Sequence, residues 1–233
     1  MNRVLQGDYR YEVKFVAKIS DYDKIMFWIQ ASSELFSEQY NDRHVNNIYY
    51  DTFDHQSYSD NVIGLSKRMK LRYRWYGDKD LKKTDGQFEL KFKNNKPGSK
   101  KTHLISFKDS LTKGSVFNHN TLRRLITSQL DNYSALIFKE YDLPVLYNNY
   151  HRKYFTSSDN LIRVTVDTNY GFNVQNTPPD ICTDTLLRLD IVIIEFKFSN
   201  NMRAKASQVL HGFPVRASRH SKYVSSIGML YDT

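Results

Sequence analysis

Basic residues alternate with apolar ones in one segment of the chain, at the spacing of one face of a β-strand. Lys70, Arg72 and Arg74 occupy every second position, and between them lie Leu71 and Tyr73. Side chains two positions apart on a strand point to the same face, so this segment predicts one cationic and one apolar face. Arginine contacts phosphate oxygens in a bidentate manner and lysine supplies a compact charge. Such a face is suited to binding a polyanion.

Carboxylates recur among the basic residues of other strand-like segments. Three segments combine a glutamate with lysines on one face: Glu12 with Lys14, Glu89 with Lys91 and Lys93, and Glu195 with Lys197. A fourth segment places Arg163 and Asp167 on one face. Carboxylate oxygens are the ligands that Mg²⁺ and Mn²⁺ prefer. The same carboxylates can instead form ion pairs with the neighbouring lysines, and the pattern leaves both roles open.

Alternation alone leaves two architectures open for these strands. In an open sheet, helices would cover the apolar face and the charged face would lie in water. In a closed barrel, the charged face would line the interior. Neighbours on one strand face lie roughly 7 Å apart, and at an effective dielectric constant of about 20 two like charges repel there by roughly 2 kcal/mol. An enclosed face would favour a bound polyanion, whereas salt would screen a solvated face.

Helical patterns are expected between the strands. Ser20, with Asp23 three residues later, is a candidate helix cap, and Ile25, Ile29 and Phe36 would form the apolar stripe. Further helices are expected over residues 122–130, 135–141, 201–211 and 221–230, strands also over residues 45–51 and 147–155, and loops over residues 94–101 and 173–184. Neither loop has the composition of a flexible linker. These patterns therefore predict an α+β fold in a single domain, residues 1–233.

The composition favours anionic partners and a reducing compartment. The formal net charge is +9, which is typical of proteins that bind nucleic acids, membrane surfaces or phosphorylated molecules. Cys182 is the only cysteine, so no intramolecular disulfide or cysteine metal cluster is expected. Residues 1–11 lack the apolar core of a signal peptide, and the apolar run over residues 191–194 is too short to cross a bilayer. We expect a cytoplasmic protein.

The aromatic residues beside the basic ones do not indicate a nucleic-acid site. Tyr73 and Trp75 have the opposite parity to Arg72 and Arg74, so one strand cannot present both kinds to the same ligand. Sites for single-stranded nucleic acid combine stacking aromatic residues with cations on one surface. We therefore expect no nucleic-acid partner and assign these two aromatic residues to the core.

Eight short motifs occur in an order that resembles a known family. They are "RYEVKF", "NNIYYDT", "KLRYRWYG", "FELKFK", "NNYHRKYF", "IRVTVDT", "IIEFKFS" and "SRHSKYVSSI". The set resembles the VTC domain, the polyphosphate-polymerase branch of the triphosphate tunnel metalloenzymes in the CYTH-like superfamily. The resemblance extends from about residue 9 to about residue 228.

The resemblance implies a closed, antiparallel, eight-stranded β-barrel with helices packed outside, in which Mn²⁺ or Mg²⁺ assists triphosphate binding. It also implies an enzyme, a metal-dependent phosphotransferase that adds the terminal phosphate of ATP to a growing chain of inorganic polyphosphate. Hydrolysis of an inorganic or nucleoside triphosphate in the same fold stays open, because only the acceptor differs. A non-catalytic polyphosphate- or nucleic-acid-binding module is the third alternative.

The resemblance also implies site residues, motif by motif. Those expected to bind phosphate are Lys14, Arg72, Arg74, Lys91, Tyr150, Arg152, Arg163, Ser221 and Lys222. Further candidates on the same strand faces are Lys70, Lys93, Lys197 and Asp167, of which Asp167 would otherwise orient Arg163 or Arg152. Glu195 is the expected metal ligand, with Glu12 and Glu89 as further candidates.

The chain departs from the family pattern at its first strand. CYTH proteins typically carry two alternating glutamates before a lysine, whereas Arg10 and Glu12 precede Lys14 here. This difference argues against a metal site made of several glutamates. The sequence also contains neither the SPX region nor the membrane helices that accompany the eukaryotic proteins. We therefore expect that this sequence does not encode transfer of product across a membrane, a step that a separate membrane partner could supply.

Overall fold

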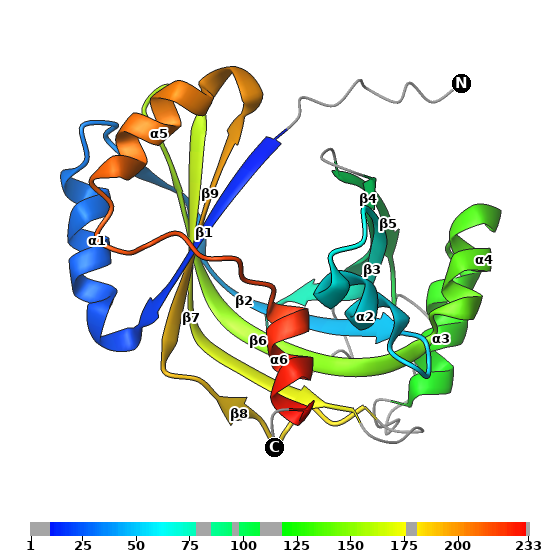
Figure 1. Cartoon of the computed structure of the whole chain (residues 1–233). Helices are drawn as coiled ribbons and strands as arrows, with labels where there is room; N and C mark the ends of the chain where they lie inside the picture. Colours follow the sequence, from blue (N-terminus) through cyan, green and yellow to red (C-terminus); the bar gives the residue numbers. More distant parts are fainter. Residues whose placement is uncertain (1–9, 78–84, 95–97, 108–117, 176–180, 232–233) are drawn as a thin grey trace. The chain divides into compact units, whose positions relative to one another are not determined.

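Most strands of the molecule, such as β3, β4 and β9, coincide with alternating segments of its sequence, and Figure 1 shows their arrangement. The computed structural model describes residues 10–77, 85–94, 98–107, 118–175 and 181–231. Its strands are β1 (Arg10–Lys18), β2 (Ser37–Asp51), β3 (Lys67–Tyr76), β4 (Gly86–Asn94), β5 (Gly98–Ile105), β6 (Leu143–Thr156), β7 (Ile162–Val174), β8 (Leu187–Arg188) and β9 (Ile191–Ser199). Its α-helices are α1 (Tyr22–Ala31), α2 (Gln56–Ile63), α3 (His119–Ser128), α4 (Asn132–Glu140), α5 (Arg203–His211) and α6 (Lys222–Tyr231). None of these helices has the length and hydropathy that a membrane crossing requires.

The sheet has two ends, and this overturns the expectation of a closed, eight-stranded barrel. Nine strands form one sheet in the order β1-β9-β7-β6-β2-β3-β4-β5, with β8 paired to β7. β1 and β5 are the ends of this order, and among the described residues they do not pair with each other. The pairing is antiparallel, as expected. The prediction of a closed barrel was therefore wrong, and so was the predicted count of eight strands.

Both end strands have features that oppose closure. Phe15 of β1 forms a β-bridge with Ala217, and the N–H of Ser218 donates to the carbonyl oxygen of Lys14 at 2.8 Å. The outer edge of β1 is therefore occupied over these residues. β5 carries Lys100 and is exposed over most of its length, and lysines on an edge strand oppose the addition of another strand. Closure also requires a particular strand tilt and shear, which alternation in the sequence does not report.

The chain divides into two compact units, each with its own hydrophobic core. Unit 1 comprises residues 1–43, 150–170 and 189–220, and unit 2 comprises residues 44–149, 171–188 and 221–233. β2, β6 and β7 contribute residues to both units. The candidate functional residues are therefore distributed over the polar strand faces of two units.

The core of unit 1 lies between the apolar faces of its strands and the helices α1 and α5 (Figure 1). Ile25 and Ile29 of α1 are fully buried. The helix is shorter than expected, since Asp21 rather than Ser20 precedes its first residue and it ends at Ala31. Phe36 lies outside the helix, yet it is buried in the same core because β2 begins directly after it.

The core of unit 2 lies between β2–β5 and the helices α3 and α4. Tyr73 and Trp75 are fully buried there, which confirms their assignment to the core. Both helices begin at capping side chains: Asn118 accepts from two N–H groups of α3, and Asp131 accepts from the N–H of Ser134. Leu130, expected in α3, lies beyond its last turn but still packs against the core.

Candidate functional site

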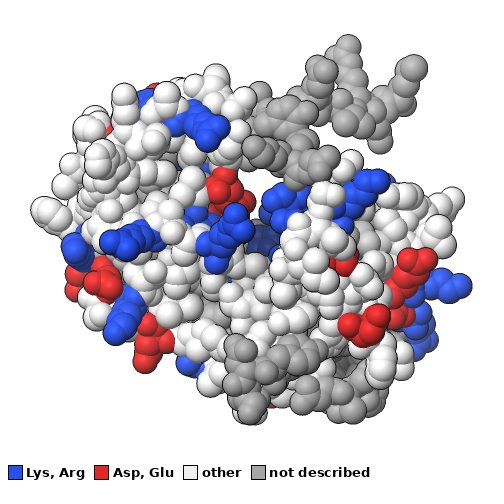
Figure 2. Space-filling model, viewed as in Figure 1, with Lys and Arg blue, Asp and Glu red and all other residues white. Residues whose placement is uncertain are grey.

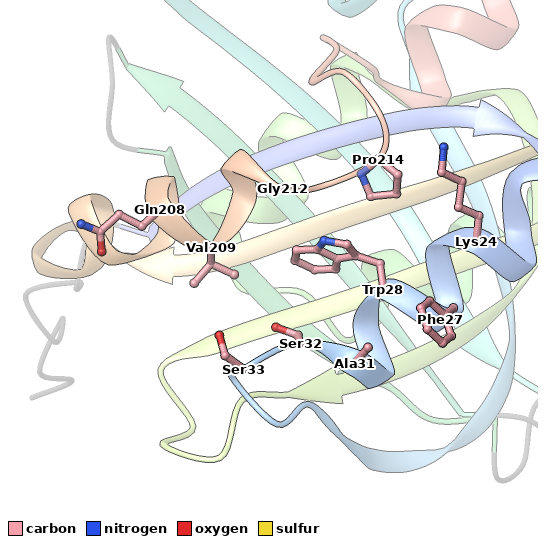
Figure 3. A pocket seen from close by; sticks show the side chains of 10 residues that line it. All are labelled: Lys24, Phe27, Trp28, Ala31, Ser32, Ser33, Gln208, Val209, Gly212 and Pro214. Atoms are coloured by element: carbon pink, nitrogen blue, oxygen red, sulfur yellow. The ribbon is translucent and has the colours of Figure 1, made fainter.

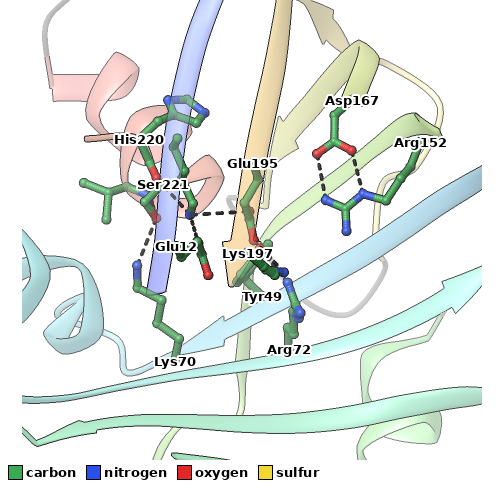
Figure 4. Close-up of polar contacts among 12 residues, drawn as sticks. Glu12, Tyr49, Lys70, Arg72, Arg152, Asp167, Glu195, Lys197, His220 and Ser221 are labelled. Carbon is green, nitrogen blue, oxygen red and sulfur yellow. Dashed lines mark hydrogen bonds and ion pairs between the residues drawn. The ribbon is translucent and has the colours of Figure 1, made fainter. Parts of the chain in front are cut away.

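Four charged residues form a compact cluster on the polar face of β1 and β9 in unit 1. In the strand register Lys14 lies opposite Glu195, and Glu12 lies opposite Lys197. Lys14 Nζ is 2.6 Å from Glu12 Oε1 and 3.8 Å from Glu195 Oε2. Lys197 Nζ is 2.5 Å from Glu195 Oε1. Acidic and basic side chains thus alternate along and across the two strands (Figure 4). These four residues are termed the β1–β9 charge cluster.

Glu195 is a buried carboxylate that stays ionised. Glu195 is 9% exposed. Burial raises the pKa of Glu195, but the positive charges of Lys197, Lys14 and Arg152 outweigh burial and hold the pKa well below its usual range. At neutral pH Glu195 therefore presents two charged oxygens, which are the ligands that hard divalent cations prefer.

Arg152 and Asp167 form a bidentate ion pair between β6 and β7 in unit 1 (Figure 4). Arg152 Nε donates to Oδ1 at 2.6 Å and Nη2 donates to Oδ2 at 2.7 Å. The guanidinium also lies 5.1 Å from the ring centre of Tyr150, a cation–π contact. Burial lowers the pKa of Arg152, but Asp167 outweighs this and raises it. Asp167 thus orients Arg152, one of the two expected pairings, while Arg163 is exposed and lies opposite Lys197.

In unit 2 two arginines of β3, Arg72 and Arg74, are held by side chains of neighbouring strands. Arg72 Nε donates to Glu89 Oε2 of β4, and Arg72 Nη1 is 3.5 Å from the hydroxyl of Tyr49 on β2. Arg74 Nε donates to Asn47 Oδ1 at 2.8 Å. Both guanidinium groups are therefore fixed on the polar face of β3, as the alternation in the sequence predicted.

Glu89 is the internal counter-ion of this face. Lys100 Nζ donates to Glu89 Oε1 at 2.9 Å, and Arg72 contacts the other carboxylate oxygen. The Glu89 side chain is 3% exposed. Burial raises the pKa of Glu89, but the charges of Arg72 and Arg74 and the hydrogen bond from Lys100 outweigh it and lower the pKa strongly. Cations contact both oxygens, so Glu89 is an ion-paired carboxylate in this structure.

A row of lysines crosses β3, β4 and β5. Lys70 lies opposite Lys91, and Lys91 lies opposite Lys100. Lys93 lies opposite Arg68 in the same way. Like charges in directly opposed positions destabilise a sheet, so a bound anion would stabilise this one. Lys100 was not expected from the sequence, because β5 has few apolar positions and its first residues fell in an expected loop.

The start of α6 lies beside β3 in unit 2. Lys70 Nζ donates to Ser221 Oγ at 2.9 Å (Figure 4). Lys222 is the first helical residue. The ring of Tyr223 stacks on Tyr49 with ring centres 5.3 Å apart. These contacts place the expected Ser221–Lys222 pair next to the cationic face of β3.

The structure brings together the expected residues of each unit and adds some that were missed. Unit 1 holds Glu12, Lys14, Tyr150, Arg152, Arg163, Asp167, Glu195 and Lys197, and unit 2 holds Lys70, Arg72, Arg74, Glu89, Lys91, Lys93, Ser221 and Lys222. Asn47 and Tyr49, which contact the arginines, were missed although their shared parity in "NNIYYDT" was a usable signal.

Over the face shown in Figure 2, basic and acidic side chains are interspersed, so the net charge does not form a surface of one sign there.

A separate groove lies between α1 and α5 on the helical side of unit 1 (Figure 3). Its volume is ≈ 580 Å³, and Phe27, Trp28 and Val209 contribute apolar lining. Lys24 is the one charged side chain among the described residues that line it. The groove therefore lacks the several cations that a phosphate chain requires.

Three comparisons with known proteins were made, and one of them identifies a family. One chain of a solved structure, described as that of the Schizosaccharomyces pombe Mediator head module, is 11% identical with a TM-score of 0.44. The match covers 89% of this chain and 96% of that one. No curated protein matches the sequence. The model of the VTC domain matches residues 9–231, so the chain belongs to the VTC domain family, which is associated with polyphosphate polymerase activity.

Proposed function

We propose that this protein transfers the terminal phosphate of ATP to a growing chain of inorganic polyphosphate. The observation that carries the proposal is the β1–β9 charge cluster, in which Lys14 and Lys197 stand beside Glu12 and Glu195. The cluster supplies cations for phosphate oxygens and hard oxygen donors for a divalent metal within one small area. Transfer between phosphates needs both.

The cations of each unit are held by side-chain counter-ions that phosphate oxygens can replace. Lys14 contacts two carboxylates, and Arg72 shares Glu89 with Lys100. These internal ion pairs stabilise the protein without ligand, because like charges on one strand face would otherwise repel. A phosphate chain would bind by taking over part of these contacts.

The carboxylates of unit 1 fit an Mg²⁺ or Mn²⁺ ion. Glu12 and Glu195 both contact Lys14 Nζ, so their carboxylates lie close to one another. Mg²⁺ typically binds one or two protein carboxylates and completes its shell with waters and substrate phosphates. Among the described residues no group of three or more histidine, cysteine, aspartate or glutamate side chains forms a metal site. Glu195, with Glu12, would therefore hold the ion, which when bound neutralises phosphoryl charge.

The protein groups act by positioning and charge. Phosphoryl transfer between phosphate oxygens needs no protein nucleophile. Arg152, oriented by Asp167, and Lys14 would bind phosphate oxygens in unit 1. Arg72 and Arg74 would do so in unit 2, where Tyr49 and Asn47 contact their guanidinium groups. These fixed cations lower the charge repulsion that opposes approach of one phosphate chain to another.

The test is incubation of the pure protein with ATP and Mn²⁺, followed by separation of long phosphate chains from orthophosphate. We expect chains longer than the triphosphate of ATP, together with ADP. Release of orthophosphate without chains would contradict the proposal and assign the protein as a triphosphatase. Binding of polyphosphate without turnover of any triphosphate would assign it as a binding module.

A further inference from the structure

Thr165 lies in unit 1, beside the charged residues of β9. It belongs to β7, and its register partner on β9 is Glu195. Arg163 and Asp167, two positions before and after it, point to the same face of the strand. Thr165 is 9% exposed. Its hydroxyl is buried and has no hydrogen-bond partner among the described residues.

A buried hydroxyl without a partner destabilises a fold, because it loses its hydrogen bonds to water and regains none. A second threonine of unit 1 behaves in the ordinary way: Thr156, 7% exposed on β6, has its Oγ1 3.5 Å from Asn160 Oδ1. Valine has nearly the shape of threonine, and both residues are enriched in strands. Packing alone therefore gives no reason for a hydroxyl at position 165.

The acidic groups around Thr165 are already bound to cations. Lys197 and Lys14 contact the carboxylate of Glu195. Both oxygens of Asp167 accept from Arg152. The hydroxyl of Thr165 is thus buried beside carboxylates whose oxygens cations already contact, and an anion bound by those cations would supply it with an acceptor.

We propose that Thr165 is a phosphate-binding residue, whose hydroxyl donates a hydrogen bond to a non-bridging oxygen of the phosphate chain bound by unit 1. The inference rests on the proposed function and extends it to a residue that carries no charge. A hydroxyl that donates to an ionised oxygen makes a short, strong hydrogen bond. Its unmet hydrogen bond in the ligand-free protein is then satisfied on binding.

The test compares Thr165→Val with Thr165→Ser by titration of tripolyphosphate in a calorimeter, both without metal and with Mn²⁺. Thr165→Val should weaken binding about tenfold or more, the effect of losing one hydrogen bond to a charged group. Thr165→Ser keeps the hydroxyl and should bind like the unsubstituted protein. Without ligand, the urea midpoint of Thr165→Val should be unchanged or higher, because an unsatisfied polar group is removed.

Thr156→Val is the matched control. It removes a buried hydroxyl that has a partner, so it should lower the urea midpoint and leave tripolyphosphate binding unchanged. Equal binding by Thr165→Val and the unsubstituted protein would overturn the role of Thr165 while the proposed function stands. That role is also overturned if Thr165→Ser loses affinity or if Thr165→Val fails to fold, because the hydroxyl would then serve packing. No tripolyphosphate binding by the unsubstituted protein would overturn both proposals.

Discussion

The hydroxyl of Tyr223 donates a hydrogen bond to Oδ2 of Asp51, and both residues are buried in unit 2. Asp51 also accepts from the N–H groups of Thr52, Ser57 and Tyr58. One carboxylate therefore joins the end of β2 and the first turn of α2 to the first turn of α6. Because α6 begins at Lys222, this contact positions the N-terminal end of the helix, where the expected phosphate ligands Ser221 and Lys222 lie.

Tyr223→Phe removes this hydrogen bond and keeps the ring that stacks on Tyr49. We expect the free energy of unfolding to fall by about 1.5–3 kcal/mol, the range for a hydrogen bond to a charged group. Tripolyphosphate binding should weaken as well, because Ser221 and Lys222 lose their support. Urea denaturation and calorimetry measure the two effects. Tyr133→Phe, an exposed tyrosine of α4, should change neither, and a Tyr223→Phe protein as stable as the original would refute the role of the contact.

Arg74→Ala tests the cationic face of β3. Arg74 is 8% exposed and donates to Asn47. We expect tripolyphosphate to bind more weakly by about 1.5–3 kcal/mol, because one charge-assisted contact is lost. Arg124→Ala is the control, since Arg124 is exposed on α3 and should not affect binding. Equal affinity of the two variants, measured by calorimetry, would remove β3 from the binding site.

Glu89 should make the protein acid-sensitive. Its folded pKa is lowered, since Arg72, Arg74 and Lys100 outweigh the burial that raises it. The stabilisation is therefore complete above the unfolded glutamate pKa of about 4.3, and it is lost as pH falls below that value toward the lower folded pKa. Glu89→Gln should flatten the dependence of unfolding free energy on pH between about 5 and 3. Denaturant titrations at each pH test this, with exposed Glu140→Gln as the control. An equally steep dependence in both variants would contradict the assignment.

Glu195→Gln separates metal binding from ion pairing. The change keeps the shape of the side chain and removes a charge that Lys197 and Lys14 contact. Turnover of ATP should fall by orders of magnitude, because a charged oxygen donor for the metal is lost. Metal-free polyphosphate binding should persist or tighten, because one negative charge leaves an anion site. Retained Mn²⁺-dependent turnover would show that Glu195 serves only as a counter-ion, and Glu140→Gln again serves as the control.

The faces of the strands were predictable because side-chain direction on a strand is a local property. Tyr73 and Trp75 were assigned to the core by parity alone, and both are fully buried. The basic residues Lys70, Arg72 and Arg74 share the opposite face for the same reason. β5 was missed because its pattern is exposed and charged over most of its length, so periodicity carried little signal there.

The pairings among charged residues were not predictable, because they depend on register between strands that are far apart in the sequence. Asp167 had two candidate arginines, and it pairs with Arg152 of the neighbouring strand β6. Glu89 forms an ion pair with Lys100 of β5, a strand that was not expected from the sequence. The hydroxyl of Thr165 has no partner within the described part of the chain, and the sequence does not indicate this, because threonine on a strand is ordinary.

The sequence by itself determined the alternating strands, the apolar and charged faces, the motif order and hence the VTC domain family. Each of these follows from residue type and spacing along one stretch of chain. Tertiary structure alone decided that the sheet has two ends, and which carboxylate neutralises which cation. The physical reason is that closure and ion pairing depend on distances between segments remote in sequence, and those distances exist only once the strands have paired.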